Sequence, residues 1–358
     1  MAQFGLYFER EKVMVYTIAA SILVFGFLVL FHELGHFALA KWTGMRVDEF
    51  AIGFGPRIWS KKYGETEYSI RCIPLGGFND IAGMNPADND AGDRGYCAKP
   101  VWKRMLTILA GPGMNLILPI FIFAVIFFSV GVSTPSTRPE LGDILPDKPA
   151  AMSGLKKGDT IRRINDVEIH EWSDIVREIL ANGQKSMTVD YVRDGKEYRT
   201  TMVPEYDKQN NRPVVGIMSS SDIRQPGLFE AVYLAVYKNG VIIYEMLNGL
   251  VKIFSGSAAA ELAGPIGVMQ MTGEVAQIGF VPLLHFAAVL SLNLGIINLL
   301  PVPALDGGHF VTLIIEGLRG KPLGDKALHY TQMVGITLLI ALMLFATKND
   351  IVRIFFAG

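Results

Sequence analysis

Residues 13–40 read VMVYTIAASILVFGFLVLFHELGHFALA, a continuous apolar run that contains the ionisable side chains of His32, Glu33 and His36. A helix needs about 20 apolar residues to cross the hydrocarbon core of a bilayer, and this run exceeds that length. It continues through both histidines without an A-x-A cleavage site, which argues against a removable signal peptide. The stretch therefore predicts a retained membrane helix that carries ionisable side chains into the bilayer.

Further apolar stretches at residues 105–130, 282–300 and 331–346 are also predicted to cross the bilayer. The composition agrees, because 50% of the 358 residues are hydrophobic and only 19% are charged. A formal net charge of −1 gives no basic field, so nucleic acid is not expected as a partner. We therefore predict a polytopic α-helical membrane protein with four transmembrane helices and the lipid bilayer as its surroundings.

The segments between these helices differ in character. Residues 42–103 contain alternating and β-branched patterns broken by glycine, which predicts a β-rich, membrane-associated loop after the first helix. Residues 132–220 are charged and turn-rich, with strand patterns such as SMTVDYVRD around one helical stretch, and predict an inserted soluble α+β domain. Ser173 is the expected cap of that helix. Residues 221–281 combine apolar positions at helical spacing with charges, which predicts an amphipathic segment on the membrane surface.

The remaining boundaries are predicted as follows: 1–41 for the N-terminal segment and first helix, 104–131 for the second helix, 282–302 for the third, 303–330 for a cytoplasmic loop, and 331–358 for the fourth helix and C-terminal tail. Lysine and arginine residues concentrate in the loops that follow the first and third helices. The positive-inside rule assigns such loops to the cytoplasm. The soluble domain and both termini are then expected on the opposite side of the membrane.

The spacing of His32 and His36 predicts a metal site. Side chains four residues apart lie on one face of a helix, so both imidazoles can reach one ion, and Glu33 is placed to act as a general base toward water. This H-E-x-x-H arrangement is typical of zinc hydrolases. The alternative is two packed histidines and a glutamate that reaches toward the membrane surface. It is disfavoured because each such group costs about 2.5–3.5 kcal/mol at the bilayer centre unless a partner compensates it.

A catalytic zinc usually has a third protein ligand, and Asp306 in the sequence NLLPVPALDGGH is the best candidate. Pro301 and Pro303 interrupt the helix before it, and irregular backbone at membrane depth is tolerated where it is buried in protein or lines a wet cavity. One alternative is that Asp306 caps a helix that begins near Gly308. His309 is a rival ligand, which we expect to pack beside the site because one carboxylate completes the ligand set.

Two asparagines are candidate substrate-binding residues. Asn298 lies one to two helical turns before Asp306 and is placed to bind a substrate carbonyl or to stabilise an oxyanion. Asn115, in AGPGMN near the start of the second span, is a candidate for the same role. For both, the alternative is an amide that hydrogen-bonds between packed membrane helices. Gly111 and Gly113 in the same stretch are expected to permit close helix packing.

Together these motifs resemble the site-2 protease family of intramembrane zinc metalloproteases. The matching motifs are HELGH at 32–36, GFGP at 53–56, PLGG at 74–77, Gly111-Pro112 with Asn115, and N-x-x-P-x-P-x-L-D-G at 298–307. The resemblance implies that His32, His36 and Asp306 bind Zn²⁺. It also implies that Glu33 is the catalytic base and that the β-rich loop dips toward the membrane to guide the substrate.

The sequence PAAMSGLKKGDTIRRIND at 149–166 resembles the PDZ domain of bacterial members of that family, which implies a peptide C-terminus as a candidate ligand. Many such members have two PDZ domains, and this chain has room for one. The sequence GGFNDIAGM at 76–84 also departs from the common G-G-Y-V-K-M. The resemblance further implies a bacterial cytoplasmic (inner) membrane, with the active site toward the cytoplasm and the PDZ-like domain outside. The implied substrates are single-span membrane proteins, such as anti-sigma factors or remnant signal peptides.

We therefore predict a zinc-dependent intramembrane endopeptidase that acts in regulated intramembrane proteolysis. The main alternative is a non-catalytic membrane adaptor, in which the PDZ-like domain is the working part and the zinc site is structural. Glu33 argues against this alternative, because a structural zinc site needs no base. A metal transporter is a second alternative, but it would favour paired repeats and a polar path through several helices, and the sequence has neither.

Overall fold

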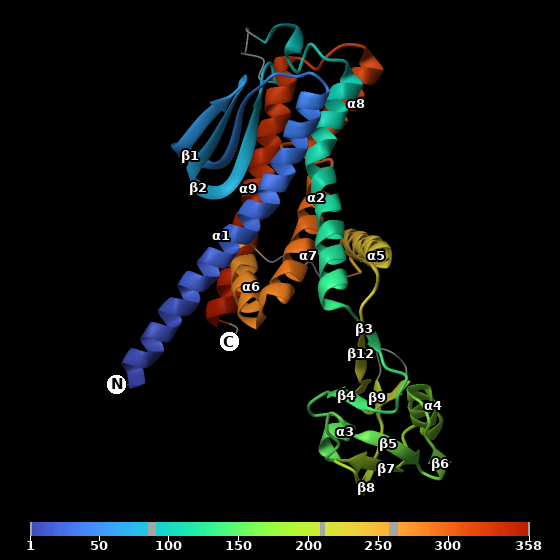
Figure 1. Ribbon diagram of the computed structural model, residues 1–358. Helices are drawn as coiled ribbons and strands as arrows, with labels where there is room; N and C mark the ends of the chain where they lie inside the picture. The colour runs from blue at the N-terminus through green and yellow to red at the C-terminus, as the bar shows by residue number, and fades with distance from the viewer. Residues whose placement is uncertain (1, 85–90, 208–211, 258–263, 357–358) are drawn as a thin grey trace. The chain divides into compact units, whose positions relative to one another are not determined.

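The computed structural model describes residues 2–84, 91–207, 212–257 and 264–356 (Figure 1). The chain forms two compact units. The membrane unit comprises Met1–Ile126 and Leu228–Gly358, and the inserted unit comprises Phe127–Gly227.

Within the described residues, four helices are long and apolar enough to cross a membrane. They are α1 (Ala2–Trp42), α2 (Val101–Val130), α7 (Phe280–Leu299) and α9 (Asp325–Phe356). Large apolar side chains on them, including Leu23, Phe121 and Val334, are more than half exposed, as expected for side chains that face lipid. The predicted polytopic α-helical membrane protein is therefore confirmed.

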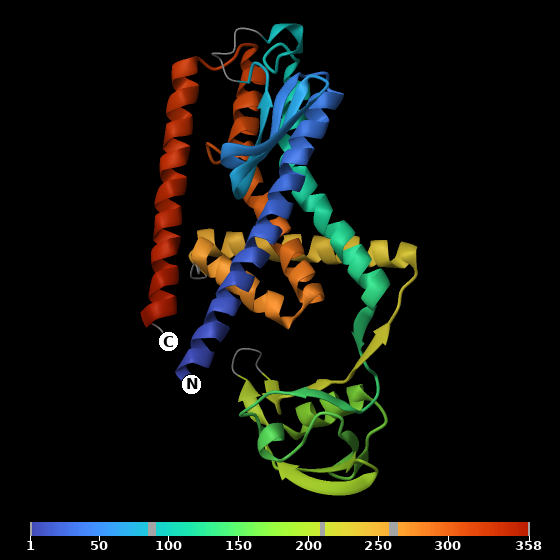
Figure 2. The ribbon, with the colours of Figure 1, turned by 60° about the vertical axis from the view of Figure 1, so that its left-hand side comes forward.

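Among the described residues, the membrane unit has three further helices: α5 (Leu228–Phe254), α6 (Pro265–Ile278) and α8 (Asp306–Arg319). Helix α5 runs across the direction of α1 and α2 in both views (Figures 1 and 2). The Asn239 amide on α5 donates a hydrogen bond to the Leu116 carbonyl of α2 at 3.0 Å, while Phe229 and Tyr233 are exposed. A transverse helix with exposed aromatic side chains suits a membrane surface. The location of α5 on the membrane surface stays a prediction.

The end of α9 is joined to the start of α6 through a buried carboxylate. Asp350 is 2% exposed and accepts hydrogen bonds from the backbone N–H groups of Gly264 and Gly267, at 3.0 and 2.8 Å. A carboxylate at this position satisfies N–H groups that have no partner within α6 and complements the helix dipole. Asp350 therefore positions the C-terminal end of α9.

The β-rich loop forms a curled hairpin beside α1 (Figure 1). Its strands are β1 (Val47–Tyr63) and β2 (Thr66–Ile81), which pair antiparallel. The first part of β1 pairs on both sides, because Phe50 lies opposite both Asn79 and Tyr68. Two bent strands thus provide four paired segments. The prediction of a β-rich element after the first helix is confirmed.

A buried carboxylate holds the curl of this hairpin. Glu49 is 7% exposed and accepts hydrogen bonds from Ser69 Oγ at 2.5 Å, from Arg71 at 2.7 Å and from Arg57 at 2.8 Å. Burial alone would raise the pKa of Glu49, but these three donors outweigh it and hold the pKa below its ordinary value. The carboxylate therefore stays ionised and joins segments of both strands.

The turn of the hairpin is tied to α1 and to the 3₁₀ turn η1 (Gly92–Arg94) by Glu65. Its carboxylate accepts hydrogen bonds from Lys41 at 2.6 Å and from Arg94 at 2.7 Å. Hydrogen bonds from Arg94 and Lys41 lower the pKa of Glu65 to about 2. The hairpin is therefore anchored to the end of the helix that carries the two histidines.

The inserted unit has a four-stranded antiparallel sheet in the order β6-β5-β7-β8, flanked by short strand pairs. Its elements are β3 (Val132–Pro135), β4 (Leu141–Ile144), α3 (Pro149–Met152), β5 (Thr160–Ile164), β6 (Val167–Glu168), α4 (Trp172–Asn182), β7 (Met187–Arg193), β8 (Lys196–Met202), β9 (Glu205–Asp207), β10 (Arg212–Val214), β11 (Ile217–Ser219) and β12 (Ser221–Arg224). The last two strands return to pair with the first two, β11 with β4 and β12 with β3. This confirms the predicted PDZ-like α+β domain.

An apolar cluster and a buried ion pair stabilise the inserted unit. Ile161, Ile175 and Val189 belong to its buried core. Asp159 is fully buried and meets Arg193 in a two-point ion pair, with both N···O distances 2.7 Å.

The expected cap of α4 was wrong. The helix begins at Trp172, and Glu171 is the cap residue, in a reciprocal capping box with Asp174. Asp174 accepts hydrogen bonds from the backbone N–H groups of His170 and Glu171, at 3.0 and 3.1 Å. Ser173 lies within the first turn and bonds to the Glu171 carboxylate instead. The capping box satisfies more free N–H groups than a serine placed two residues later.

Candidate metal centre

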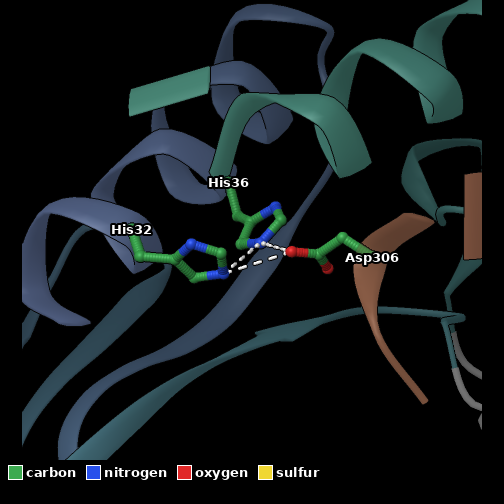
Figure 3. Close-up of side chains that lie close together, drawn as sticks. All are labelled: His32, His36 and Asp306. Atoms are coloured by element: carbon green, nitrogen blue, oxygen red, sulfur yellow. Dashed lines mark hydrogen bonds and ion pairs between the residues drawn. The ribbon is translucent and has the colours of Figure 1, made fainter. Parts of the chain in front are cut away.

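The two histidines of α1 direct the same ring nitrogen toward one point (Figure 3). Their rings are 4.9 Å apart, centroid to centroid, and nearly perpendicular. His32 Nε2 lies 3.3 Å from His36 Nε2. Both side chains are largely buried, with 12% and 11% of their surfaces exposed. The helical spacing of four residues thus brings both imidazoles to one site.

Asp306, the first residue of α8, reaches the same point from a distant part of the sequence (Figure 3). Its Oδ2 atom lies 3.2 Å from His32 Nε2 and 3.4 Å from His36 Nε2. The three candidate ligand atoms lie within 4.8 Å of one another. Asp306 does not cap α8, because the cap residue is Leu305 and no side-chain cap hydrogen bond is present. Its carboxylate is directed at the histidines instead.

Helix α2 holds the opposite nitrogen of each imidazole. His36 Nδ1 lies 2.8 Å from the Thr107 carbonyl oxygen, so that nitrogen carries the proton and Nε2 keeps a free lone pair. His32 Nδ1 lies 3.1 Å from the side-chain amide of the fully buried Asn115. A histidine that binds a metal usually donates a hydrogen bond from its other ring nitrogen to an acceptor, which fixes the orientation of the ring.

The Asn115 amide provides a test of whether the site suits a metal. As placed, Nδ2 faces His32, and the buried Oδ1 has no hydrogen-bond partner among the described residues. Oxygen and nitrogen of an amide are exchanged by a half-turn, and the hydrogen-bond network decides between them. The exchanged amide would accept a hydrogen bond from His32 Nδ1–H and leave Nε2 free to bind a metal. Two imidazole nitrogens and a carboxylate oxygen therefore fit a divalent metal such as zinc.

Glycines allow the backbones to come close around this site. A Cβ atom on Gly111 of α2 would lie 2.2 Å from His36 Nε2, and one on Gly35 of α1 would lie 2.3 Å from the Ala110 carbonyl oxygen. Cβ atoms on Gly307 and Gly308 would lie 2.2–2.4 Å from backbone oxygens at the end of α7 and just after it. Helices α1 and α2 therefore meet, and the start of α8 approaches the end of α7, at distances that only glycine permits.

Glu33 lies beside the metal site but outside the group of ligand atoms. The group of described residues suited to hold a metal consists of His32, His36 and Asp306. The Glu33 carboxylate instead accepts a hydrogen bond from Asn79 of β2 at 2.7 Å. A carboxylate next to a metal site with no bond to it has the placement that a general base requires.

Asn298 and His309 were also considered as a substrate contact and as a ligand. Among the described residues, the Asn298 side chain makes no hydrogen bond, and it is only partly buried. His309 follows Asp306 by three residues on α8 and is not among the residues that converge. Burial lowers the pKa of His309 and favours its neutral form.

An ion pair fixes the helix that carries Asp306. Arg104 of α2 meets Glu316 of α8 with two hydrogen bonds, at 3.0 and 2.6 Å. Both side chains are largely buried, and such paired geometry is strong and directional. Sequence reasoning assigned no role in the site to Arg104, Glu316, Thr107 and Asn79, because each acts through a partner far along the chain.

Metal-assisted hydrolysis of a peptide bond combines a metal site with a nearby proton acceptor. Here the two histidines and the Glu33 carboxylate lie on one membrane-spanning helix. The fold and the site place the chain in the class of membrane-embedded metalloproteases. The chain belongs to peptidase family M50, the site-2 protease family, because that family model matches residues 20–342.

Known proteins similar to this chain carry related descriptions. The regulator of sigma-W protease RasP from Bacillus subtilis is 35% identical, and the match covers 95% of this chain and 99% of that protein. A putative zinc metalloprotease from Clostridium acetobutylicum is also 35% identical, with 94% and 98% covered. Among solved structures, the PDZ domain of an SdrC-like protein from Listeria monocytogenes matches 24% of this chain and 88% of its own, at 20% identity and a TM-score of 0.20.

Proposed function

We propose that this integral membrane metalloprotease is a zinc-dependent endopeptidase that cuts single-span membrane proteins in or near their transmembrane segments. In this proposal His32, His36 and Asp306 hold the zinc and Glu33 is the base. The observation that carries it is the convergence of Nε2 of both histidines and Oδ2 of Asp306 within 4.8 Å. The similar proteins with zinc metalloprotease in their names support the choice of metal.

Each residue of the site has a separate task in this mechanism. When bound, zinc supplies a Lewis acid that activates water at neutral pH and polarises the scissile carbonyl. Glu33 takes the proton from the attacking water and gives it to the leaving amine. Thr107 and Asn115 orient the two imidazoles through their Nδ1 atoms. Asn115 is therefore proposed as a support for His32 in place of an oxyanion donor, whereas substrate binding by Asn298 stays a prediction.

Removal of the metal tests this proposal. Stripping the metal from the purified enzyme with a chelator is expected to abolish cleavage of a single-span substrate in vesicles. In the proposed mechanism the bound metal is what activates the attacking water. Addition of stoichiometric Zn²⁺, but not Mg²⁺, is expected to restore cleavage, since two imidazoles and one carboxylate favour zinc. Metal content is measured in parallel by mass spectrometry. Full activity in metal-free protein would refute the zinc-dependent function.

The substrate must be extended to be cut, and the hairpin offers a partner for it. A peptide bond in a helix is shielded, and each unpaired backbone group costs several kcal/mol in lipid. The segment Gly77–Ile81 of β2 pairs with β1 on one side, and no described strand pairs with its other side. This segment also contacts Glu33 through Asn79. We therefore propose that an unwound substrate adds a strand to the hairpin beside the base.

This strand addition is tested on the substrate. N-methylation removes a peptide N–H donor, and alternate amides of a strand point to the same side. Methylating the alternate amides that face the hairpin is expected to raise KM about 2- to 10-fold per bond, since each bond contributes about 0.5–1.5 kcal/mol. Methylation of the intervening amides is the matched control and is expected to change KM little. Equal effects at both sets of positions would rule out a paired strand.

The inserted unit is proposed to select substrates. A groove of about 780 Å³ lies between α4 and residues 214–218, with Trp172, Ile175 and Ile179 among its lining. A groove lined by both apolar and charged side chains beside a short strand suits the extended C-terminus of a peptide. The name of the Bacillus subtilis relative, a regulator of sigma-W protease, supports an anti-sigma factor as one substrate class.

The sidedness of the protein follows from its charge distribution. Basic residues concentrate in the loops after the first and third spans, and the positive-inside rule places those loops in the cytoplasm. We therefore propose that the metal site opens toward the cytoplasm and that the PDZ-like domain lies on the outer side of the bacterial cytoplasmic membrane.

A further inference from the structure

The residue that binds the Glu33 carboxylate belongs to the hairpin rather than to any spanning helix. Asn79 lies in β2, opposite Phe50 of β1. Its Nδ2 atom donates to Glu33 Oε2 at 2.7 Å and to the Glu33 backbone carbonyl at 2.8 Å. Both N–H groups of the Asn79 side-chain amide therefore donate to Glu33, which lies 46 positions earlier in the chain.

The same face of the strand also contacts the stem of Glu33. Gly77 precedes Asn79 by two residues, so both face the same side of β2. A Cβ atom on Gly77 would lie 3.0 Å from Glu33 Cγ and 3.5 Å from Val29 Cγ1. The glycine thus lets the strand approach the Glu33 stem while Asn79 holds its carboxylate and its backbone oxygen.

The part of β2 that carries Asn79 is packed firmly against the end of α1. Ile81, two residues further along the strand, belongs to a buried cluster with Met45, Val47 and Ala40, which joins the hairpin to the end of α1. Asn79 is therefore not a surface side chain that happens to touch Glu33. Its position is determined by the packing of the hairpin on the same helix that carries the base.

The other end of the Asn79 amide is not used by the contacts with Glu33. Its Oδ1 atom is buried and has no hydrogen-bond partner among the described residues. An unpaired buried acceptor destabilises the structure, so a donor is expected to satisfy it when the site is in use. A water molecule or a peptide N–H of a bound substrate would supply such a donor.

We propose that Asn79 is a positioning residue for the catalytic base. It fixes the Glu33 carboxylate and its backbone, and so makes the placement of the base depend on the position of the substrate-guiding hairpin. The inference rests on the proposed role of Glu33 as the base. A charge-assisted hydrogen bond of this kind is stronger than a neutral one and restricts the carboxylate to one orientation.

The test uses two variants of position 79 that differ in their hydrogen bonding. Asn79→Asp keeps the size of the side chain but removes the donor and places a second carboxylate beside Glu33. Asn79→Val removes the donor without adding a charge and suits a strand. We expect kcat to fall about 10-fold in Asn79→Val and about 100-fold in Asn79→Asp, which is the range for groups that support a site without touching the substrate. KM and zinc content are expected to change less than about twofold.

A role in packing alone predicts the opposite order. Asp is nearly the same size as Asn, so a space-filling residue would tolerate Asn79→Asp better than Asn79→Val, and wild-type kcat in Asn79→Asp would overturn the proposal. A fall in zinc content equal to the fall in kcat would also overturn it, because the effect would then act through the metal site. Asn248→Asp, at an exposed position on α5, makes the same change of charge away from the site and is the matched control.

Failure of this inference is distinguishable from failure of the proposed function. If Glu33→Gln is inactive and Asn79→Asp is fully active, only the positioning role is wrong. If Glu33→Gln retains activity, Glu33 is not the base and the proposed mechanism itself fails.

Discussion

Glu33→Gln is expected to abolish peptide-bond cleavage while leaving the bound zinc in place. Glutamine has the shape of glutamate and can still accept the hydrogen bond from Asn79, but it cannot take a proton from water. General bases contribute about 10²- to 10⁴-fold to the rates of such reactions, and a loss of at least that size is expected. Zinc should remain because the three converging ligand atoms belong to His32, His36 and Asp306. Cleavage of a single-span substrate and metal content measure the two quantities separately.

The same variant separates the protease from the alternative classes. A PDZ adaptor with a structural zinc site, or a metal transporter, would keep its function without a proton acceptor at position 33. Glu245→Gln, at an exposed position on α5, removes the same charge away from the site and is the matched control. Cleavage by Glu33→Gln at the wild-type rate would exclude Glu33 as the base.

Gly111→Ala is expected to remove the metal and the activity together. The added Cβ would lie 2.2 Å from His36 Nε2, 2.6 Å from Cε1 and 2.8 Å from Cδ2, so the imidazole must leave its position. Because His36 is also held by the Thr107 carbonyl, its displacement breaks two interactions. We expect zinc affinity to fall about 100-fold or more, at the upper end of the range for changes that displace the support of a metal ligand. Competition with a chromogenic chelator measures this affinity without reference to cleavage.

Gly113→Ala is the control that the same helix provides. It lies two residues away on α2, and a Cβ atom there meets nothing within 4 Å. Alanine is favoured over glycine inside a helix by about 1 kcal/mol, so both variants should gain helix stability from the substitution itself. Zinc loss in Gly111→Ala with normal thermal stability and normal behaviour of Gly113→Ala would assign the effect to the clash. Normal zinc affinity in Gly111→Ala would show that the helices can separate without cost.

Two glycines of α2 that look alike in the sequence have different surroundings in the structure. Gly111 and Gly113 appear equivalent in the sequence AGPGMN, and close packing was expected for both. The structure distinguishes them, because only Gly111 faces His36. Which face of α2 meets α1 depends on the rotation of one helix against another, and a short glycine motif does not specify that rotation.

Local periodicity was sufficient for the spanning helices and for the pairing of His32 with His36. A helix repeats every 3.6 residues whatever it packs against, and membrane spans are long apolar runs. The spanning helices and the histidine pair can therefore be recognised from continuous stretches of sequence. The irregular, proline-containing stretch before Asp306 also marked a position where a side chain could enter a buried site. These local rules account for the fold class and for the candidate site that the sequence predicts.

Other features depended on contacts between distant parts of the chain. The structure places the Thr107 carbonyl and the Asn115 amide behind the histidines, closes the Arg104–Glu316 pair and brings Asn79 to Glu33. Sequence also misplaced the cap of α4, because Ser173 has the right chemistry but Glu171 and Asp174 satisfy more N–H groups at the actual helix start.

The sequence by itself determined which side chains bring the chemistry and which segments enter the membrane. Only the tertiary structure decided which partners orient those side chains, since a hydrogen bond between residues 46 or 83 positions apart exists only after helices and hairpin have packed. The physical reason is that helix periodicity and hydrophobicity act along the chain, whereas the direction of an amide or carboxylate is set by whatever surface folds against it.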